Sequence, residues 1–321
     1  MEGSHPKQQI VHTKTHPKLL TSLTGVYHAN YPVQSIGSNR RNLRNTPFVD
    51  FVGSINGMGS DTIRVRKAGL DGFDAFTAFT GATEDSGVNA STLTDGFVDV
   101  VCKRNSLAYE ITDLASMTGL NSGDIDPFRI AESIANSYEA LFANITGAAV
   151  AGFTGIRGST GADLTIAVFL SAIQDLEKAA SGKGAPGPYV ALLHPKQWAD
   201  LQDNILAQTT GILQFVAASY EAISAKGSHY KGNFMGVEIY TSSYITDDAT
   251  DHAGAIFAPG ALGFATGMPS PVGANEAMTM GEVSIEMDRD SVKAITSVVG
   301  HAYLGMSIID QFRGVTLISA V

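Results

Sequence analysis

The stretch PFRIAESIANSYEALFANITGAAV, residues 127–150, decides the fold more than any other part of the chain. Its apolar side chains recur at steps of three and four residues, which places them on one face of an α-helix. Asp126 stands at the N-cap position and Pro127 at the first helical position, where these residue types are favoured. A helix of this length spans about 36 Å. We therefore expect a long beam with one buried face, formed by Ile130, Ile134, Tyr138, Leu141, Ile145 and Ala149.

Two strands are expected before this helix. In DTIRVRKAG, apolar Ile63 and Val65 alternate with two arginines, so the strand has one apolar and one cationic face. Its expected partner is GFVDVVCKR, residues 96–104. Residues 69–94 between them are rich in Gly, Thr, Ser, Asp and Phe and are long for a connection inside a compact domain. The pattern predicts a hairpin whose loop projects.

An α/β segment is expected after the long helix. A second amphipathic helix is indicated from its cap, Asp163, to Gly182. PYVALL then reads as a buried strand, and HPKQWADLQ starts a helix at Pro195 that buries Trp198 and Leu201. GVEIYTS and AGAIFAP are further strand candidates. The closing residues look all β, because they are rich in β-branched side chains and interrupted by glycine.

Composition points to a surface that meets other protein. Of 321 residues, 44% are hydrophobic and only 16% are charged, against about 25% charged in ordinary soluble domains. We find no apolar run long enough to span a membrane and no secretion signal, and we expect a chain made and kept in the cytoplasm. Cys102 is the only cysteine, so an internal disulfide is excluded, and it reads as a small apolar filler in a strand.

Charge is unevenly distributed. The formal net charge is −10, which argues against a protein whose main task is to coat nucleic acid. Residues 1–48 carry +5 and the remainder carries −15. This basic arm has few apolar positions and cannot bury enough surface to fold alone. We expect it to become ordered along a neighbouring subunit.

In this order, the polar arm, hairpin, long helix, α/β lobe and closing β segment resemble the Hong Kong 97-like capsid fold of tailed bacteriophages. The resemblance rests most on ALLHPKQWADLQ (191–202), FMGVEIYTSSYI (234–245), GAIFAPGALGFA (254–265) and the closing YLGMSIIDQFRGVTLIS. It implies an α+β fold with five parts. They are an N-terminal arm (1–48), an E-loop region (49–116), the spine helix with the first part of the peripheral domain (117–164), an α/β axial domain (165–281) and closing peripheral strands (282–321).

The resemblance also implies a function. It is that of a major capsid protein, a structural subunit that assembles into hexamers and pentamers of an icosahedral head. A precursor shell would expand on DNA packaging, and the expected location is the virion, assembled in the host bacterial cytoplasm. Expected partners are copies of the chain, a portal protein, packaged double-stranded DNA contacted non-specifically, and a cement protein as a further candidate, with no membrane. Because we see no long coiled-coil N-terminal extension, we also expect a separate scaffolding protein.

No catalytic residue, cofactor or metal is expected, and the candidate functional residues are charges at subunit interfaces. The arm basic residues could clamp the acidic body of the adjacent chain or meet DNA phosphates, and we favour the clamp. The cationic strip on the hairpin is either a solvated face or pairs with acids of a neighbour. The basic residues of the arm are Lys7, Lys14, Lys18, Arg40, Arg41 and Arg44. The cationic strip consists of Arg64, Arg66 and Lys67, and the candidate acidic partners are Glu282, Glu286 and Asp288.

Other interpretations have less support. A covalent cross-link from Lys67 to an asparagine of another subunit would need three placed groups, and no asparagine can be assigned. The run DDATDH, residues 247–252, could suggest a metal site, but we interpret it as a solvated turn. His194 is expected to help start the helix at Pro195. Two rival functions remain, an encapsulin-type bacterial compartment of the same fold and, more distantly, a cytoplasmic α/β enzyme, although no catalytic motif is present.

Overall fold

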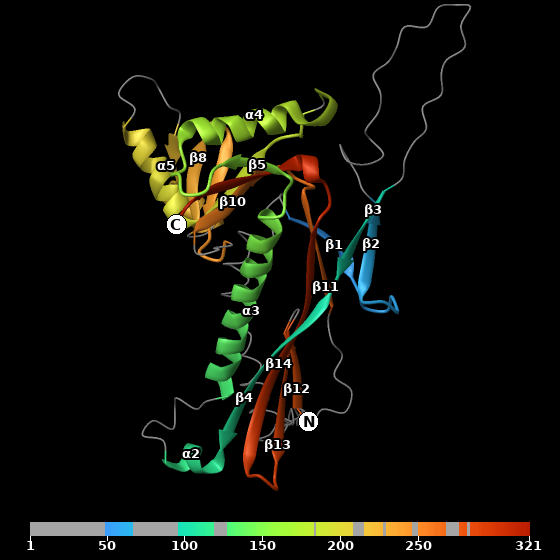
Figure 1. The fold of residues 1–321 in the computed structure, drawn as a ribbon. Helices are drawn as coiled ribbons and strands as arrows, with labels where there is room; N and C mark the ends of the chain where they lie inside the picture. The colour runs from blue at the N-terminus through green and yellow to red at the C-terminus, as the bar shows by residue number, and fades with distance from the viewer. Residues whose placement is uncertain are drawn as a thin grey trace, which may run out of the picture.

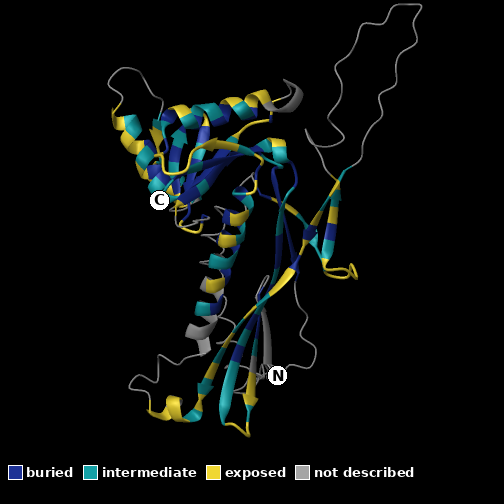
Figure 2. Ribbon diagram, in the orientation of Figure 1, coloured by how far each residue is buried: buried dark blue, intermediate teal, exposed yellow. Residues whose placement is uncertain are grey.

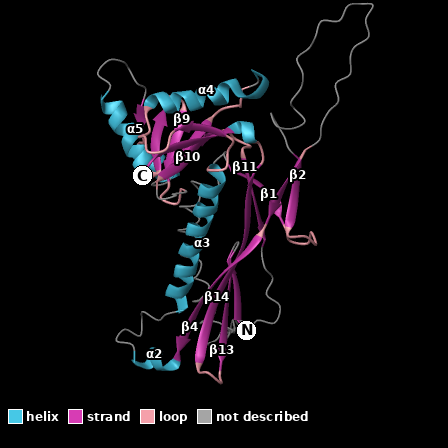
Figure 3. Ribbon diagram, in the orientation of Figure 1, coloured by secondary structure: helices cyan, strands magenta, loops and turns pink. Residues whose placement is uncertain are grey.

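The chain forms two lobes joined by a long helix and a long strand (Figure 1). The computed structural model describes residues 49–66, 96–118, 127–182, 184–207, 215–226, 229–245, 250–267, 276–280 and 283–321. One lobe is built on a seven-stranded sheet and the other on a six-stranded sheet. Helices and sheets are both present in each lobe (Figure 3). The predicted α+β class is confirmed.

The seven-stranded sheet has the order β5-β15-β10-β6-β9-β8-β7, and we call the lobe built on it the axial lobe because it contains most of the segment predicted as axial. Helix α4 lies across this sheet (Figure 1). The strands are β5 (Gly155–Gly158), β6 (Tyr189–Leu193), β7 (Phe215–Ala217), β8 (Tyr230–Phe234), β9 (Val237–Thr241), β10 (Asp251–Phe257) and β15 (Gly314–Ala320). The helices are α4 (Ile166–Gly182), α5 (Pro195–Ala207) and α6 (Tyr220–Lys226).

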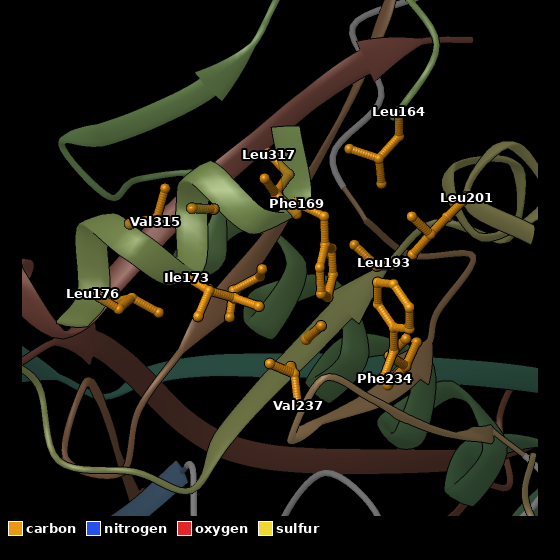
Figure 4. Packing of buried hydrophobic residues seen from close by; sticks show 14 of the residues in the cluster. Leu164, Phe169, Ile173, Leu176, Leu193, Leu201, Phe234, Val237, Val315 and Leu317 are labelled. Atoms are coloured by element: carbon orange, nitrogen blue, oxygen red, sulfur yellow. The ribbon is translucent and has the colours of Figure 1, made fainter. Parts of the chain in front are cut away.

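The core of the axial lobe lies between α4 and this sheet. Phe169 and Leu176 of α4 are fully buried, and the Phe169 ring lies 5.6 Å from that of Phe234 on β8 (Figure 4). The predicted burial of Trp198 and Leu201 on α5 is also confirmed. Burying each such side chain contributes about 1.5–3 kcal/mol, so this cluster stabilises the lobe by itself.

The predicted start of α4 needs a correction. The helix begins at Ile166, and the hydroxyl of Thr165 accepts a hydrogen bond from the Val168 N–H at 3.4 Å. Asp163 stands too far ahead of the first turn for this role. Both residue types favour the N-cap position, so the pattern alone could not separate them.

The six-stranded sheet forms the peripheral lobe. Its order is β1-β11-β14-β13-β12, and β4 also pairs with β14, along Ile295–Leu304. The strands are β1 (Val49–Ser54), β4 (Lys103–Thr112), β11 (Leu262–Gly267), β12 (Glu276–Met280), β13 (Val283–Asp290) and β14 (Ile295–Ile308). Short helix α2 (Asp113–Thr118) follows β4 and is tied to β13 by a two-bond ion pair between Asp113 and Arg289.

The predicted long helix is α3 (Pro127–Val150), and its extent is as expected. Its N-terminal half packs on the peripheral sheet, where Ile134 and Tyr138 are buried against Val298. Buried and exposed positions alternate along the described part of the helix (Figure 2). Gly300 permits the close approach, because a Cβ there would overlap the Ile134 side chain. At the other end the Thr316 hydroxyl donates to the Val150 carbonyl at 2.9 Å, which fixes the helix to the axial sheet. The predicted cap Asp126 lies outside the described residues.

The predicted hairpin is confirmed at its base. Strands β2 (Thr62–Arg66) and β3 (Phe97–Val101) pair antiparallel. Ile63 and Val100 are buried together with Cys102, which lies between β3 and β4 and not inside a strand. Burial raises the pKa of the Cys102 thiol, as expected for an apolar filler. The projecting loop predicted at 69–94 lies outside the described residues.

The strands are divided between the two lobes differently from the predicted domain boundaries. β11 joins the peripheral sheet, although its residues were assigned to the axial segment, and both β5 and β15 join the axial sheet. The reason is pairing across the chain, since β11 pairs with the end of β14 while β15 pairs with β10. The chain therefore passes between the lobes along α3 into β5, and then at two strand-to-strand crossings, from β10 to β11 and from β14 to β15.

Candidate self-association surfaces

The two crossings between the lobes are fixed by a buried ion pair. Between β14 and β15 lies a 3-10 turn, Gln311–Arg313, capped by Asp310. The Asp310 carboxylate is fully buried and accepts from Phe312 N at 2.9 Å and from Arg313 Nε at 3.0 Å. Arg313 Nη1 also donates to the Pro259 carbonyl at 2.9 Å on the other crossing. One salt bridge therefore holds both connections at the junction.

The predicted cationic strip has an acidic partner within its own hairpin. Arg64 on β2 donates from Nε and Nη2 to the Asp99 carboxylate on β3 at 2.8 and 3.1 Å. The Arg64 hydrogen bond lowers the pKa of Asp99, and the guanidinium lies 5.8 Å from the Phe97 ring centre. Both side chains of the pair are largely exposed, so the pair remains open to a further partner. Arg66 is exposed on the same strand, and Lys67 lies outside the described residues.

The acids proposed as partners lie on the peripheral sheet. Glu286 and Asp288 belong to β13, where they stand opposite Val299 and Ser297 of β14. Asp288 is exposed and Glu286 is half-buried. Glu282 and all six basic residues of the arm lie outside the described residues. The structure thus places the two described acids on one face of one strand, far from Arg64 in the chain, and their pairing with a neighbour stays a prediction.

Sequence reasoning missed a group of exposed apolar side chains in the axial lobe. Leu206 on α5, Val216 on β7 and Tyr220 on α6 have exposed fractions of 81%, 65% and 87%. Met235, in the turn between β8 and β9, is also exposed. These elements pack together, since β7 pairs with β8 and the Trp198 ring of α5 lies 5.5 Å from that of Phe215. We call these four residues the axial apolar group. We treat this group as a candidate surface for contact with another protein chain.

The prediction that the DDATDH run (247–252) is a solvated turn is wrong for its last two residues. Asp251 and His252 are buried at the start of β10, and Gly161 N donates to Asp251 Oδ1 at 2.9 Å. The His252 ring stacks on that of His194 at a centroid distance of 3.5 Å. His194 starts α5 as predicted, because its Nδ1 accepts from the Lys196 N–H. Asp247 and Asp248 lie outside the described residues.

Within the described ranges, no three His, Cys, Asp or Glu side chains are grouped so as to hold a metal ion. No helix in the described part of the chain is long and apolar enough to cross a membrane.

Comparison with known proteins gives matches in structure only. No family model matches the sequence, and no curated protein matches it. The head of Helicobacter pylori bacteriophage KHP40 is 12% identical over 83% of this chain and 85% of that chain, with a TM-score of 0.55. The mature capsid of bacteriophage PhiM1 is 9% identical over 84% and 85%, with a TM-score of 0.56. The holo-SrpI encapsulin complex of Synechococcus elongatus PCC 7942 is 12% identical over 87% of both chains, also at 0.56.

These likenesses define the fold. Each aligns with more than four fifths of both chains, so the match covers both lobes and not one shared motif. The fold is that of subunits of closed protein shells. More particularly, the chain has the Hong Kong 97-like capsid fold that the order of its elements predicted.

Proposed function

We propose that the chain is a structural subunit of the icosahedral head of a tailed phage, without enzymatic activity. The observation that carries this proposal is the match over both lobes to the heads of phages KHP40 and PhiM1. A fold alone does not specify function. Here it is supported by a low charged fraction and by apolar side chains that are exposed on the axial lobe.

The subunits assemble through different surfaces of the same chain. Rings of five or six copies need heterologous contacts, in which one patch meets another patch of the next subunit. The axial apolar group is our candidate for the ring contact, and the basic arm is our candidate clamp on the acidic body of a neighbour. The strip at Arg64 and Arg66 would then meet Glu286 and Asp288 of an adjacent copy. Repetition over many copies would give such weak contacts their combined effect.

Maturation is proposed to be a movement of lobes. A precursor shell, built with a separate scaffolding protein and a portal protein, would expand when double-stranded DNA is packaged. Any relative movement of the lobes would have to keep or break the Asp310–Arg313 junction, which ties two of their connections together. A cement protein is a further candidate partner. The head would be assembled in the host cytoplasm and end in the virion.

An encapsulin-type compartment is the second candidate. It is favoured by the match to the SrpI encapsulin complex, which is as good as that to the phage capsids. The two functions differ in what the shell encloses. A phage head encloses DNA, whereas a compartment encloses protein cargo.

Electron microscopy of the chain produced in bacteria tests the proposal. We expect closed particles with icosahedral outlines, and nuclease-protected DNA when the genes of the source genome are expressed together. Val216→Asp with Tyr220→Asp should leave a folded subunit that forms few particles, while Glu221→Gln on the same helix should assemble normally. Particles filled with a specific protein and free of DNA would favour the compartment. A stable monomer under all conditions would refute both functions.

A further inference from the structure

The peripheral sheet has an open edge formed by β4. This strand pairs with β14 along its whole length, from Thr112 opposite Ile295 to Lys103 opposite Leu304. On its other side, no strand among the described residues pairs with it. In an antiparallel sheet, every second residue of an edge strand points its N–H and C=O outward. A strand of ten residues therefore offers a long row of backbone groups to another chain.

A cleft between α3 and the face of the sheet reaches β4. This cleft of about 440 Å³ lies between β4, α3 and β14. The edge segment Arg104–Leu107 lines it from the sheet, and Ser137 and Tyr138 line it from the helix. The backbone of β4 is thus not covered by α3 along this segment, and strand addition to a sheet edge uses such backbone groups.

The charges along β4 are self-complementary. Arg104 and Glu110 are both exposed and lie on the same face, since exposed and half-buried residues alternate along this strand. They stand symmetrically about Leu107, three residues before it and three after it. If two copies of β4 pair antiparallel with Leu107 opposite Leu107, Arg104 of each copy lies directly opposite Glu110 of the other. Neither has an ion pair within the described part of the chain.

Only this register places the opposite charges together. A shift by two residues puts Arg104 opposite Ala108 or Thr112. A shift by one residue would join the exposed face of one β4 strand to the half-buried face of the other. The contact is isologous, as a two-fold axis requires. Ten residues a side is below the roughly 20–30 of a stable interface, so the contact adds to a lattice and does not form a stable dimer alone.

We propose that the β4 edge pairs with the β4 edge of a second copy across a local two-fold axis, with Leu107 on the axis and two Arg104–Glu110 pairs beside it. The sheets of two subunits are then continuous. This inference rests on the proposed self-assembly, and it names a contact between rings that the heterologous contacts inside a ring cannot provide.

Disulfide trapping tests the register. In Leu107→Cys the two thiols face each other across the axis, where Cβ atoms of opposite residues are about 4.5–5.5 Å apart. We expect a dimer on a non-reducing denaturing gel after mild oxidation. Thr112→Cys is the matched control on the same strand, because its two copies would be about 33 Å apart and cannot react. The unsubstituted chain, with buried Cys102 alone, should also give no dimer.

Charge reversal at the two exposed positions Arg104 and Glu110 gives a second measurement. In the Leu107→Cys background, Arg104→Glu or Glu110→Arg should each lower the dimer fraction about fivefold, since two cross-strand pairs become repulsive. The double variant should restore it, and so should a mixture of the two single variants. Equal dimer fractions in all variants would refute the pairing.

The outcomes separate this inference from the proposed function. Particles without a Leu107→Cys dimer overturn the strand pairing and leave the shell function standing. A dimer without particles supports the pairing and counts against the shell. If neither forms, both are wrong.

Discussion

Asp310→Asn is expected to loosen the junction between the lobes. The substitution keeps the shape of the side chain and removes the only charge of a fully buried group. The carboxylate accepts from Arg313 Nε and from Phe312 N, and an asparagine can replace only one of these acceptor oxygens. The guanidinium of Arg313, 20% exposed, then lies in the junction without its closest counter-charge.

The magnitude follows from this burial. Breaking a buried ion pair by removing one partner destabilises a protein by about 3–5 kcal/mol. We expect about 3 kcal/mol, the lower end, because Asp50 lies close enough for Arg313 to lower its pKa, although burial raises that pKa more. Asp50 can therefore compensate in part.

Urea unfolding of the unassembled subunit measures this loss. The single tryptophan, Trp198, reports on the axial core, and far-ultraviolet circular dichroism reports on both lobes. We expect the midpoint to fall with an unchanged slope. Arg64→Gln is the control, because it removes an aspartate–arginine pair that is exposed, and it should not shift the midpoint measurably. A loss below about 1 kcal/mol for Asp310→Asn would falsify the idea that this pair holds the junction.

Three further changes have defined outcomes. Gly147→Ala should lower the thermal midpoint by an amount equivalent to about 1–3 kcal/mol, because its Cβ would overlap the Tyr244 carbonyl; an unchanged midpoint would contradict the close packing. Phe169→Ala should cost about 3–5 kcal/mol in urea unfolding, since the ring is fully buried, and a smaller loss would mean that the core collapses around it. The Arg157 hydrogen bond holds the pKa of Asp175 below its ordinary value, so this carboxylate stabilises the fold at neutral pH and the effect is lost as pH falls through that lowered pKa. Asp175→Asn should therefore flatten the fall in melting temperature below about pH 5, and an identical pH profile would disprove the linkage.

Local patterns predicted the elements well because the physics that forms them is local. The apolar spacing from Pro127 to Val150 is enough to form a helix whatever it packs against. Alternation around Ile63 predicted β2, and the position of Pro195 predicted the start of α5. The Arg64–Asp99 pair could have been found as well, since aligning the two predicted strands as a hairpin places these residues opposite each other.

The candidate surfaces were harder to predict. DDATDH reads as a polar loop, yet Asp251 and His252 are buried because β10 is covered by β15 and by the stacked His194. The axial apolar group follows no period, since Leu206, Val216 and Tyr220 belong to three different short elements. Exposure of such residues depends on which faces are covered, and this is not a property of any single segment.

The sequence by itself determined the kinds and order of the elements, because helix and strand periodicity act over a few residues. Tertiary structure alone decided which strand joins which sheet. β11 and β15 are similar apolar strands, and their separation into different lobes depends on pairing with β14 and β10 far away in the chain. It also decided that β4 keeps an open edge, because an edge exists only after all other pairings have been made.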